Sequence, residues 1–269
     1  MSDVPTTRVS NLLAGKVAIV SGIGPGLGRQ AALALAAHGA DLALGARKQR
    51  SLDAVAEEVA AIGSRVVTLS TDITDQSQCD ALAAKAASEL GRVDVLVNNA
   101  FRFDVFQSFA DVDIDAWAAI TQTNVFGTLR MVKAAVPHLK AAGGGSVINV
   151  ASMAARKPPI LQGGYATSKG GLLTATKVLA GELGPDHIRV NAVVPGWMAG
   201  PSVDIYLQMT AQARGISEDE VLAELAAPVP LGHIPSDREV AGTIVFLASE
   251  LSAAITGQAI DTNGGELMV

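Results

Sequence analysis

The sequence has very little cysteine, few aromatic residues and no long apolar run. Cys79 is the only cysteine in 269 residues, so it excludes an internal disulfide and cannot by itself make a zinc site. The four histidines are scattered without the spacing of metal ligands. We therefore expect a reducing compartment and no bound metal.

Membrane and nucleic-acid functions are also disfavoured by what is missing. No stretch approaches the roughly 18 uninterrupted apolar residues that a membrane span needs, and the first residues lack the charged-then-apolar order of a signal peptide. The formal net charge is −6, and no basic stripe with interleaved aromatic residues is present. We expect a cytoplasmic protein that binds neither nucleic acid nor membrane.

Small and apolar residues are abundant instead, with 27 glycines, many alanines and 49% apolar residues. Short apolar runs rich in β-branched residues alternate with alanine-rich stretches of helical periodicity. The predicted strands are 17–21, 41–46, 65–69, 93–98, 146–150, 189–194 and 258–261. The predicted helices are 28–37, 52–62, 76–90, 115–141, 166–183 and 237–249.

This alternation predicts an α/β fold, a Rossmann-like, doubly wound sheet of seven parallel strands with helices on both faces. No repeat or linker divides the chain, so we expect residues 1–269 to form a single domain. Residues 197–235 break the pattern, because they contain four prolines, no strand and two short predicted helices at 202–211 and 217–226. An excursion this long predicts a lid over the substrate.

A glycine-rich turn follows the first predicted strand. Its glycines fit a GxxxGxG spacing, whereas GxGxxG would need a glycine where Leu27 stands. Glycines let the backbone approach a phosphate, and the following helix presents free amides to it. We expect a dinucleotide here, the alternative being a turn without a ligand. The expected contacts are Ser21, Gly22, Gly24, Gly26, Leu27 and Gly28.

The end of the second predicted strand indicates which dinucleotide binds. An acidic residue there would bind the ribose hydroxyls of NAD(H), but the residue is Ala46, followed by Arg47 and Lys48. A missing acid beside two bases favours NADP(H), with Arg47 as the partner of the 2′-phosphate. NAD(H) is the alternative cofactor, and a basic loop without a ligand is another interpretation.

A serine, a tyrosine and a lysine follow the fifth predicted strand. Ser152 precedes Tyr165, one of only two tyrosines, and Lys169 comes four residues after Tyr165. Residues four apart share a helix face, so we expect the Lys169 ammonium near the Tyr165 hydroxyl. A nearby cation lowers the pKa of a phenol from its usual value of about 10. Such a tyrosine can exchange a proton with an alcohol or carbonyl oxygen.

These residues resemble those of the short-chain dehydrogenase/reductase family, in its shorter-chain branch, over essentially the whole chain. The resemblance implies hydride transfer between a nicotinamide and a secondary alcohol or ketone. The matching residues, in family order, are Gly22, Gly26, Gly28, Asp72, Asn98-Asn99-Ala100, Asn124, Ser152, Tyr165, Lys169 and Pro195-Gly196.

The resemblance also implies a role for each matching residue. Tyr165 would be the general acid/base, Ser152 would hydrogen-bond the substrate oxygen, and Asn124 would position a water in a proton relay. Lys169 would hold the nicotinamide ribose and lower the pKa of Tyr165. The other residues implied at the cofactor are Asp72, which would contact the adenine, and Ile73, Asn98, Ala100, Pro195, Gly196 and Met198.

Two positions depart from the family pattern. Phe101 stands where glycine is common, which suggests an altered pocket wall. No threonine occurs in residues 197–200, which puts in doubt the usual side-chain contact to the nicotinamide carboxamide.

Aromatic residues gather where the substrate is expected. Four of the six phenylalanines fall in residues 101–109, at the carboxyl edge of the predicted sheet. We expect an apolar or cyclic substrate with one hydroxyl or keto group, the alternative being that these side chains pack the lid or a subunit interface. The predicted substrate contacts are Phe101, Phe103, Met153, Trp197 and Tyr206.

Other functions and the assembly follow from the same resemblance. It implies a homo-oligomer, a tetramer or a dimer, paired through the helices at 115–141 and 166–183. A non-catalytic nucleotide-binding sensor could share the fold, but it would not need Ser152, Tyr165 and Lys169 together. The epimerase/dehydratase branch for sugar nucleotides carries a sizeable C-terminal domain, whereas only residues 258–269 follow the last predicted helix here.

Overall fold

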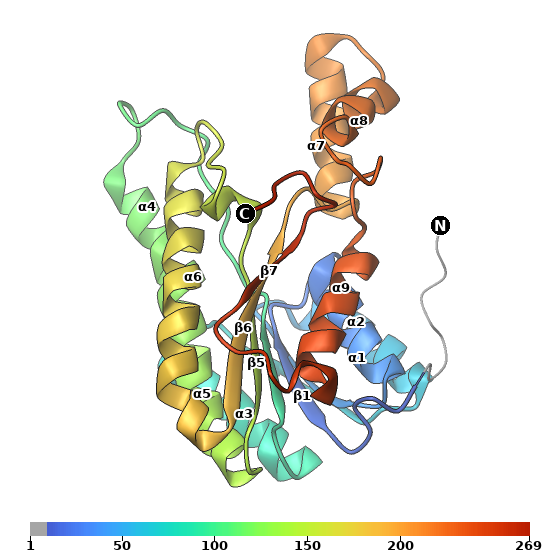
Figure 1. Cartoon of the computed structure of the whole chain (residues 1–269), viewed down its shortest axis with the longest axis vertical. Coiled ribbons are helices and arrows are strands. Elements are labelled where there is room, and N and C mark those ends of the chain that lie inside the picture. Colours follow the sequence, from blue (N-terminus) through green and yellow to red (C-terminus); the bar gives the residue numbers. More distant parts are fainter. Residues whose placement is uncertain (1–9) are drawn as a thin grey trace.

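The computed structural model describes residues 10–269 as one sheet with helices on both faces (Figure 1). Seven parallel strands pair in the order β3-β2-β1-β4-β5-β6-β7. The predicted doubly wound, seven-stranded sheet is confirmed. In chain order the strands are β1 (Val17–Ser21), β2 (Asp41–Ala46), β3 (Val66–Ser70), β4 (Val95–Asn98), β5 (Gly145–Val150), β6 (Ile188–Pro195) and β7 (Ala259–Thr262).

Two helical layers cover the sheet, and each buries its own apolar core. One layer holds α1 (Leu27–Ala37), α2 (Gln49–Ile62) and α9 (Asp237–Ala248), and its core includes the fully buried Leu33 and Leu35. The other holds α3 (Gln76–Leu90), α5 (Thr128–Ala141) and α6 (Gly163–Leu183), with Leu82 and Met131 at its centre. Because both faces are covered, the inner strands are mostly apolar, as the sequence pattern predicts.

The strand order reverses at β1, which lies between β2 and β4. In such sheets ligands bind in the crevice outside the carboxyl ends of the strands at this switch point. The loops that follow β1 and β4 both begin there, so the fold brings the glycine turn and residues 99–112 to one edge.

The prediction of one continuous helix at 115–141 is wrong. The structure divides it into α4 (Ile114–Thr121), a π-helix (Gln122–Gly127) and α5. Periodicity did not reveal the break, because the π segment is only six residues long and too short to show a period of its own. Such turns are frequent at functional sites, and this one contains the predicted site residue Asn124.

The predicted lid segment contains two helices, α7 (Pro201–Arg214) and α8 (Glu218–Ala226), which stand beyond the edge of the sheet (Figure 1). They pack on each other through a small separate cluster that includes Val203, Leu207 and Val221. Main-chain bonds close the base of the segment, since Ala199 N donates to Pro235 O at 2.9 Å. The segment is therefore a helical hairpin held at one end.

Within residues 10–269, none of the helices has both the length and the apolar character that a membrane crossing requires.

Candidate active site

The glycine turn after β1 is shaped so that only glycine fits its two closest approaches. Gly22 has φ +100° and its amide donates to Gly45 O at 2.8 Å. A Cβ on Gly22 would overlap the main chain of Ala100, and one on Gly28 would overlap Gly22 O. Helix α1 then starts after the N-cap Gly26, which has no side chain to satisfy the first amides. The turn therefore fits the pyrophosphate of a dinucleotide.

Asn99, which was not among the predicted contacts, holds this turn in place. Its Nδ2 donates to Gly22 O at 2.6 Å. The amides of Asn99 and Ala100 both donate to Ser21 O, at 2.8 and 2.9 Å. The polar pair after β4 was the available signal, but sequence reasoning chose the first asparagine of that pair.

Asn98 instead supports the sheet and α6 from inside. Its Nδ2 donates to Asn149 Oδ1 at 3.0 Å, and Asn149 Nδ2 donates to Thr176 Oγ1 at 2.9 Å. All three side chains are buried. Asn98 thus fixes the position of α6, and its predicted contact with the cofactor stays a prediction.

The end of β2 carries no acid, and its surroundings are basic. Ala46 is half-buried, and Arg47 and Lys48 are exposed beside it. Asp72, after β3, accepts bonds from the amide and hydroxyl of Thr74, and these bonds together with Arg47 hold the pKa of its carboxyl below the usual value. The next residue, Ile73, is buried against Gly127. Arg47 and Asp72 therefore lie close together, as the predicted adenosine site requires.

The predicted catalytic side chains meet at the carboxyl end of β5. Ser152 follows that strand and hydrogen-bonds the side chain of Tyr165, which lies in the first turn of α6. Lys169, one turn further along α6, is buried and places its Nζ 5.6 Å from the centroid of the Tyr165 ring. The structure therefore brings Ser152, Tyr165 and Lys169 together.

The titration of Tyr165 and Lys169 is dominated by burial. Burial raises the pKa of Tyr165 to about 12, and the bond with Ser152 acts in the opposite sense. Burial also lowers the pKa of Lys169 to about 7, and its Nζ donates to Val150 O at 2.7 Å. The predicted lowering of the Tyr165 pKa by Lys169 is therefore wrong for this structure, because the ammonium is turned to β5 and is itself desolvated.

Asn124 uses its whole side-chain amide to hold the loop after β4. Its Oδ1 accepts from Arg102 N at 2.7 Å, and its Nδ2 donates to Arg102 O at 3.0 Å and to Ser168 Oγ at 2.9 Å. It is fully buried. The side chain therefore anchors the loop to α6, and a part in a proton relay stays a prediction.

Asp104 is a site residue that the sequence did not indicate. Its Oδ2 accepts from the amide of Tyr165 at 2.6 Å, and its Oδ1 accepts from Val105 N at 2.7 Å. Gln162, the N-cap of α6, makes no side-chain cap bond of its own. Asp104 therefore caps α6 from a distant loop and fixes the turn that carries Tyr165.

The residues after β6 form another wall of the site. Gly196 lies against Asn263 and the sulfur of Met153, and the Asn263 Nδ2 is 3.9 Å from that sulfur. Pro195 ends β6 in register with Thr262 of β7, and Met198 packs on the core beneath α1 and α9. Of the predicted residues in this segment, Gly196 therefore lies beside Met153, which follows Ser152.

Comparison with known proteins decides the family. The family model described as enoyl-(acyl carrier protein) reductase matches residues 22–266. Trans-4-hydroxycyclohexanecarboxylate dehydrogenase of Sinomonas cyclohexanicum is 37% identical over 267 residues, which cover 97% of this chain and 96% of that protein. This chain belongs to the short-chain dehydrogenase/reductase family.

Two further members have different substrates in their names. L-rhamnose 1-dehydrogenase (NAD(P)(+)) of Sphingomonas sp. (strain SKA58) is 33% identical, covering 94% of this chain and 97% of that protein. The crystal structure of carveol dehydrogenase from Mycobacterium avium in complex with NAD matches with a TM-score of 0.89 at 27% identity, covering 96% and 99% of the two chains. The present short-chain dehydrogenase/reductase is accordingly an NAD(P)-dependent oxidoreductase that acts on CH–OH groups.

Around Tyr165, this short-chain dehydrogenase/reductase exposes aromatic side chains. The Phe103 ring stacks on the Tyr165 ring with centroids 5.1 Å apart, and Phe101 meets it edge-on at 6.3 Å. Phe101 and Phe103 are nevertheless 49% and 47% exposed. Across the edge, Trp197 and Tyr206 of the lid segment pack with centroids 4.9 Å apart. The phenylalanines form an open apolar wall over the tyrosine.

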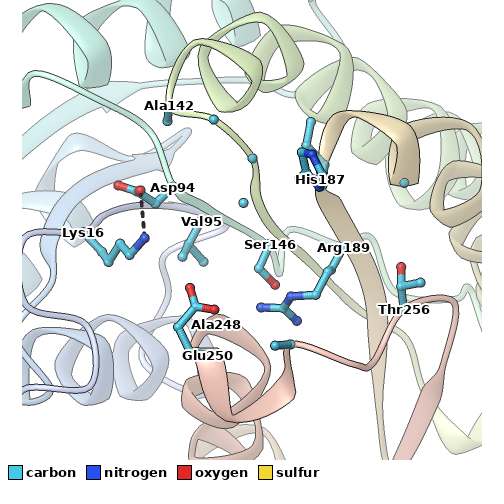
Figure 2. A pocket seen from close by; sticks show the side chains of 16 residues that line it. Lys16, Asp94, Val95, Ala142, Ser146, His187, Arg189, Ala248, Glu250 and Thr256 are labelled. Carbon is cyan, nitrogen blue, oxygen red and sulfur yellow. Dashed lines mark ion pairs between the residues drawn. The ribbon is translucent and has the colours of Figure 1, made fainter.

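A hollow of about 450 Å³ lies at the opposite edge of the sheet, where the strands begin (Figure 2). Two of its charged side chains already have partners, since Lys16 lies 3.4 Å from Asp94 and Arg189 donates to Ser252 at 2.8 Å. Because ligands of doubly wound sheets bind at the carboxyl ends of the strands, we assign this hollow no part in the reaction.

Proposed function

We propose that this protein transfers hydride between NADP(H) and a secondary alcohol or ketone with an apolar or cyclic body, with Tyr165 as the general acid/base. The observation that carries the proposal is the placement of the Tyr165 side chain. It is hydrogen-bonded to Ser152 and its ring stacks on the exposed Phe103.

The chain's own groups would handle the proton and the developing charge. A bound nicotinamide would supply or accept the hydride. In reduction, Tyr165 Oη gives its proton to the carbonyl oxygen while Ser152 Oγ–H donates a hydrogen bond to the same oxygen as negative charge builds on it. In oxidation the Tyr165 phenolate takes the hydroxyl proton instead. Lys169 lies close enough to stabilise that phenolate once its ammonium turns from Val150.

The preference for NADP(H) is supported by charge at the end of β2. Ala46 offers no carboxylate to the ribose hydroxyls, and Arg47 lies exposed at the adjacent position. A guanidinium can bind a 2′-phosphate through two hydrogen bonds, which a ribose hydroxyl cannot match. NAD(H) is the alternative, and NAD is the cofactor in the carveol dehydrogenase complex.

The apolar substrate is supported by exposed side chains on both sides of the site. Phe106 and Phe109 extend the wall beyond Phe103, and Met209 on α7 is 66% exposed on the lid segment. Exposed apolar surface of this kind marks a binding site or an interface. We propose that the helical hairpin of residues 197–235 closes over the substrate.

The decisive test is a panel of cyclic and aliphatic secondary alcohols and ketones, with sugars and polyols as contrast, followed at the nicotinamide absorbance with each cofactor. Tyr165→Phe removes the proton donor but leaves the glycine turn intact. We expect its kcat to fall about 10²–10⁴-fold with little change in cofactor affinity. A variant that keeps more than about a tenth of the activity would contradict the role of Tyr165, and a preference for polyols would contradict the apolar substrate.

We also propose a homo-oligomer paired through α6 and through the stretch formed by α4, the π-helix and α5. Phe126 and Val178, on the π-helix and on α6, are exposed in the single chain and would become buried in such a pair. Sedimentation analysis tests this directly. A cytoplasmic location stays a prediction.

A further inference from the structure

Asp237 is a buried carboxylate at a place where three helices begin. It is the first residue of α9 and is 8% exposed. Its Oδ2 lies 3.0 Å from where a Cβ on Gly26, the N-cap of α1, would stand. The same oxygen lies 2.5 Å from where a Cβ on Gly200, the N-cap of α7, would stand. The carboxylate therefore fills the space between the glycine turn and the lid segment.

The Asp237 side chain has no hydrogen bond or ion pair to any group in the described residues 10–269. Gly26 and Gly200 are the N-caps of α1 and α7, and neither has a side chain that could cap its own helix. Helix N-termini favour anions, and a buried carboxylate without partners is unfavourable. This place therefore has the character of an anion site, and the Asp237 carboxyl of the protein itself occupies it.

A dinucleotide would bring a second anion to this place. The pyrophosphate of a dinucleotide binds at the N-terminus of the first helix of such a fold, which here is α1 after Gly26. Residues 197–200 lack the threonine usual in the family, and the Asp237 carboxyl lies where a side chain on Gly200 would project. An ionised carboxyl would repel the pyrophosphate, whereas a protonated one can donate a hydrogen bond to a phosphate oxygen.

We propose that a dinucleotide binds this protein with Asp237 protonated, so that binding takes up a proton from solvent and weakens as Asp237 ionises. The inference rests on the dinucleotide binding proposed above, and it adds a residue and a proton that the family resemblance does not supply.

The charged groups around Asp237 are few. Asp204 on α7 acts with burial to raise the pKa of Asp237 to about 6. On α1, Arg29 is paired with Glu58, and on α9, Glu239 is engaged by Ser236 and His233. The neighbouring Arg238 also has a partner of its own. No cation among these groups is paired with the Asp237 carboxyl.

The expected size follows from the fraction of Asp237 that is protonated. For a group with a pKa of about 6, that fraction falls about 25-fold between about pH 5.5 and pH 7.5. The Kd of a ligand that binds only the protonated form rises by the same factor. We therefore expect the wild-type affinity to fall by about tenfold to 25-fold across this range.

The test is calorimetric titration with NAD⁺, which lacks a 2′-phosphate and so carries no phosphate group that titrates in this range. Asp237→Asn should bind with an affinity that is nearly constant with pH, and about tenfold or more tighter than wild type at pH 7.5. Titrations in two buffers of different ionisation enthalpy should show proton uptake by the wild type near pH 7 and none by Asp237→Asn.

Two further variants sharpen the test. Asp204→Asn removes the acid that raises the Asp237 pKa, so the midpoint of the pH dependence should move to lower pH with its amplitude kept. Because Asp204 is exposed, this variant also serves if Asp237→Asn does not fold. Asp219→Asn, an exposed acid on α8, is the matched control and should behave as wild type.

Each outcome separates the two proposals. If wild type binds NAD⁺ but Asp237→Asn keeps the wild-type pH dependence, or binds more weakly at pH 7.5, the role of Asp237 is overturned. If Asp204→Asn leaves the midpoint where it was, the proposal fails as well. If wild type binds neither NAD⁺ nor NADP⁺ at any pH, the proposed function itself is overturned.

Discussion

Replacing Asp104 is the most informative test of how the fold positions Tyr165, the proposed general acid/base. The carboxylate joins the loop after β4 to α6 through bonds of 2.6 Å from Tyr165 N and 2.7 Å from Val105 N. Asp104→Ala removes both acceptors at a position that is 9% exposed, so water cannot easily replace them. Asp104→Asn keeps one oxygen as an acceptor without the charge.

The magnitude follows from the lost helix cap. Leaving a buried amide without an acceptor costs about 1–3 kcal/mol, and loss of an N-cap costs about 0.5–2 kcal/mol. These figures describe the same loss, so we expect Asp104→Ala to destabilise the protein by about 2 kcal/mol. For a chain of this size the Tm would fall by about 4–8 °C. Asp104→Asn should lose less than half of this, because its amide oxygen can still accept from Tyr165 N.

Activity should fall more than stability. Without Asp104, no side chain links the loop that carries Phe103 to the first turn of α6 through the Tyr165 amide. A displacement of about 1 Å at a reacting group can lower the rate about 10²-fold. We expect Asp104→Ala to lower kcat by about tenfold to 10²-fold with cofactor affinity unchanged, because the glycine turn is not touched. Asp104→Asn should recover most of kcat.

The assay is steady-state kinetics with the best substrate of the panel, with thermal unfolding and cofactor titration on the same samples. Asp111→Ala is the control, since this exposed acid of the same loop bonds only the Ser108 side chain. If Asp104→Ala kept wild-type kcat and Tm, Asp104 would not position Tyr165. If Asp104→Asn were as impaired as Asp104→Ala, the charge and not the acceptor would be responsible.

Further predictions concern the cofactor, the substrate and the proton. Arg47→Ala should raise the Kd of NADPH about tenfold or more and leave the Kd of NADH nearly unchanged, because a charge-assisted bond contributes about 1.5–3 kcal/mol. Both Kd values can be measured by fluorescence titration, and an unchanged preference for NADPH over NADH would contradict the role of Arg47 at the 2′-phosphate. Phe103→Ala should lower kcat/KM for cyclic alcohols about tenfold, because it removes an aromatic surface that a bound apolar substrate would cover, with small alcohols much less affected. The oxidation rate should rise with pH between about pH 7 and pH 10, because oxidation needs the Tyr165 phenolate and burial raises the pKa of Tyr165 to about 12. The reduction rate should stay level over this range, because reduction uses the protonated phenol. A plateau of the oxidation rate below about pH 8 would show that the pKa of Tyr165 is far lower in the working enzyme.

Much of the fold could be predicted because it depends on local patterns. Apolar runs with helices between them predicted a parallel sheet, and β1 and β2 have the predicted bounds. The glycine turn was predictable because its residues are adjacent in sequence and only glycine allows the close approach at Gly22. The π-helix around Asn124 was not predicted, because six residues are too few to show a period different from that of the flanking helices.

The sequence predicted only part of the candidate site. Tyr165 and Lys169 are four residues apart and were expected to face each other, yet Lys169 Nζ bonds Val150 O on a neighbouring strand. Asn99, and not Asn98, reaches the glycine turn. In both cases residue type and spacing indicated the right region, but the direction of each side chain depends on which partner the packing places beside it.

By itself, the sequence determined the class of the fold, and it indicated three residues, Ser152, Tyr165 and Lys169, that the structure brings together at one edge of the sheet. Only the tertiary structure decided what surrounds them. Asp104 caps the helix of Tyr165 across 61 residues of sequence, and Asp237 lies against the distant Gly26. The physical reason is that periodicity and turn chemistry act between near neighbours, whereas burial, pKa and capping depend on groups that meet only when the layers pack.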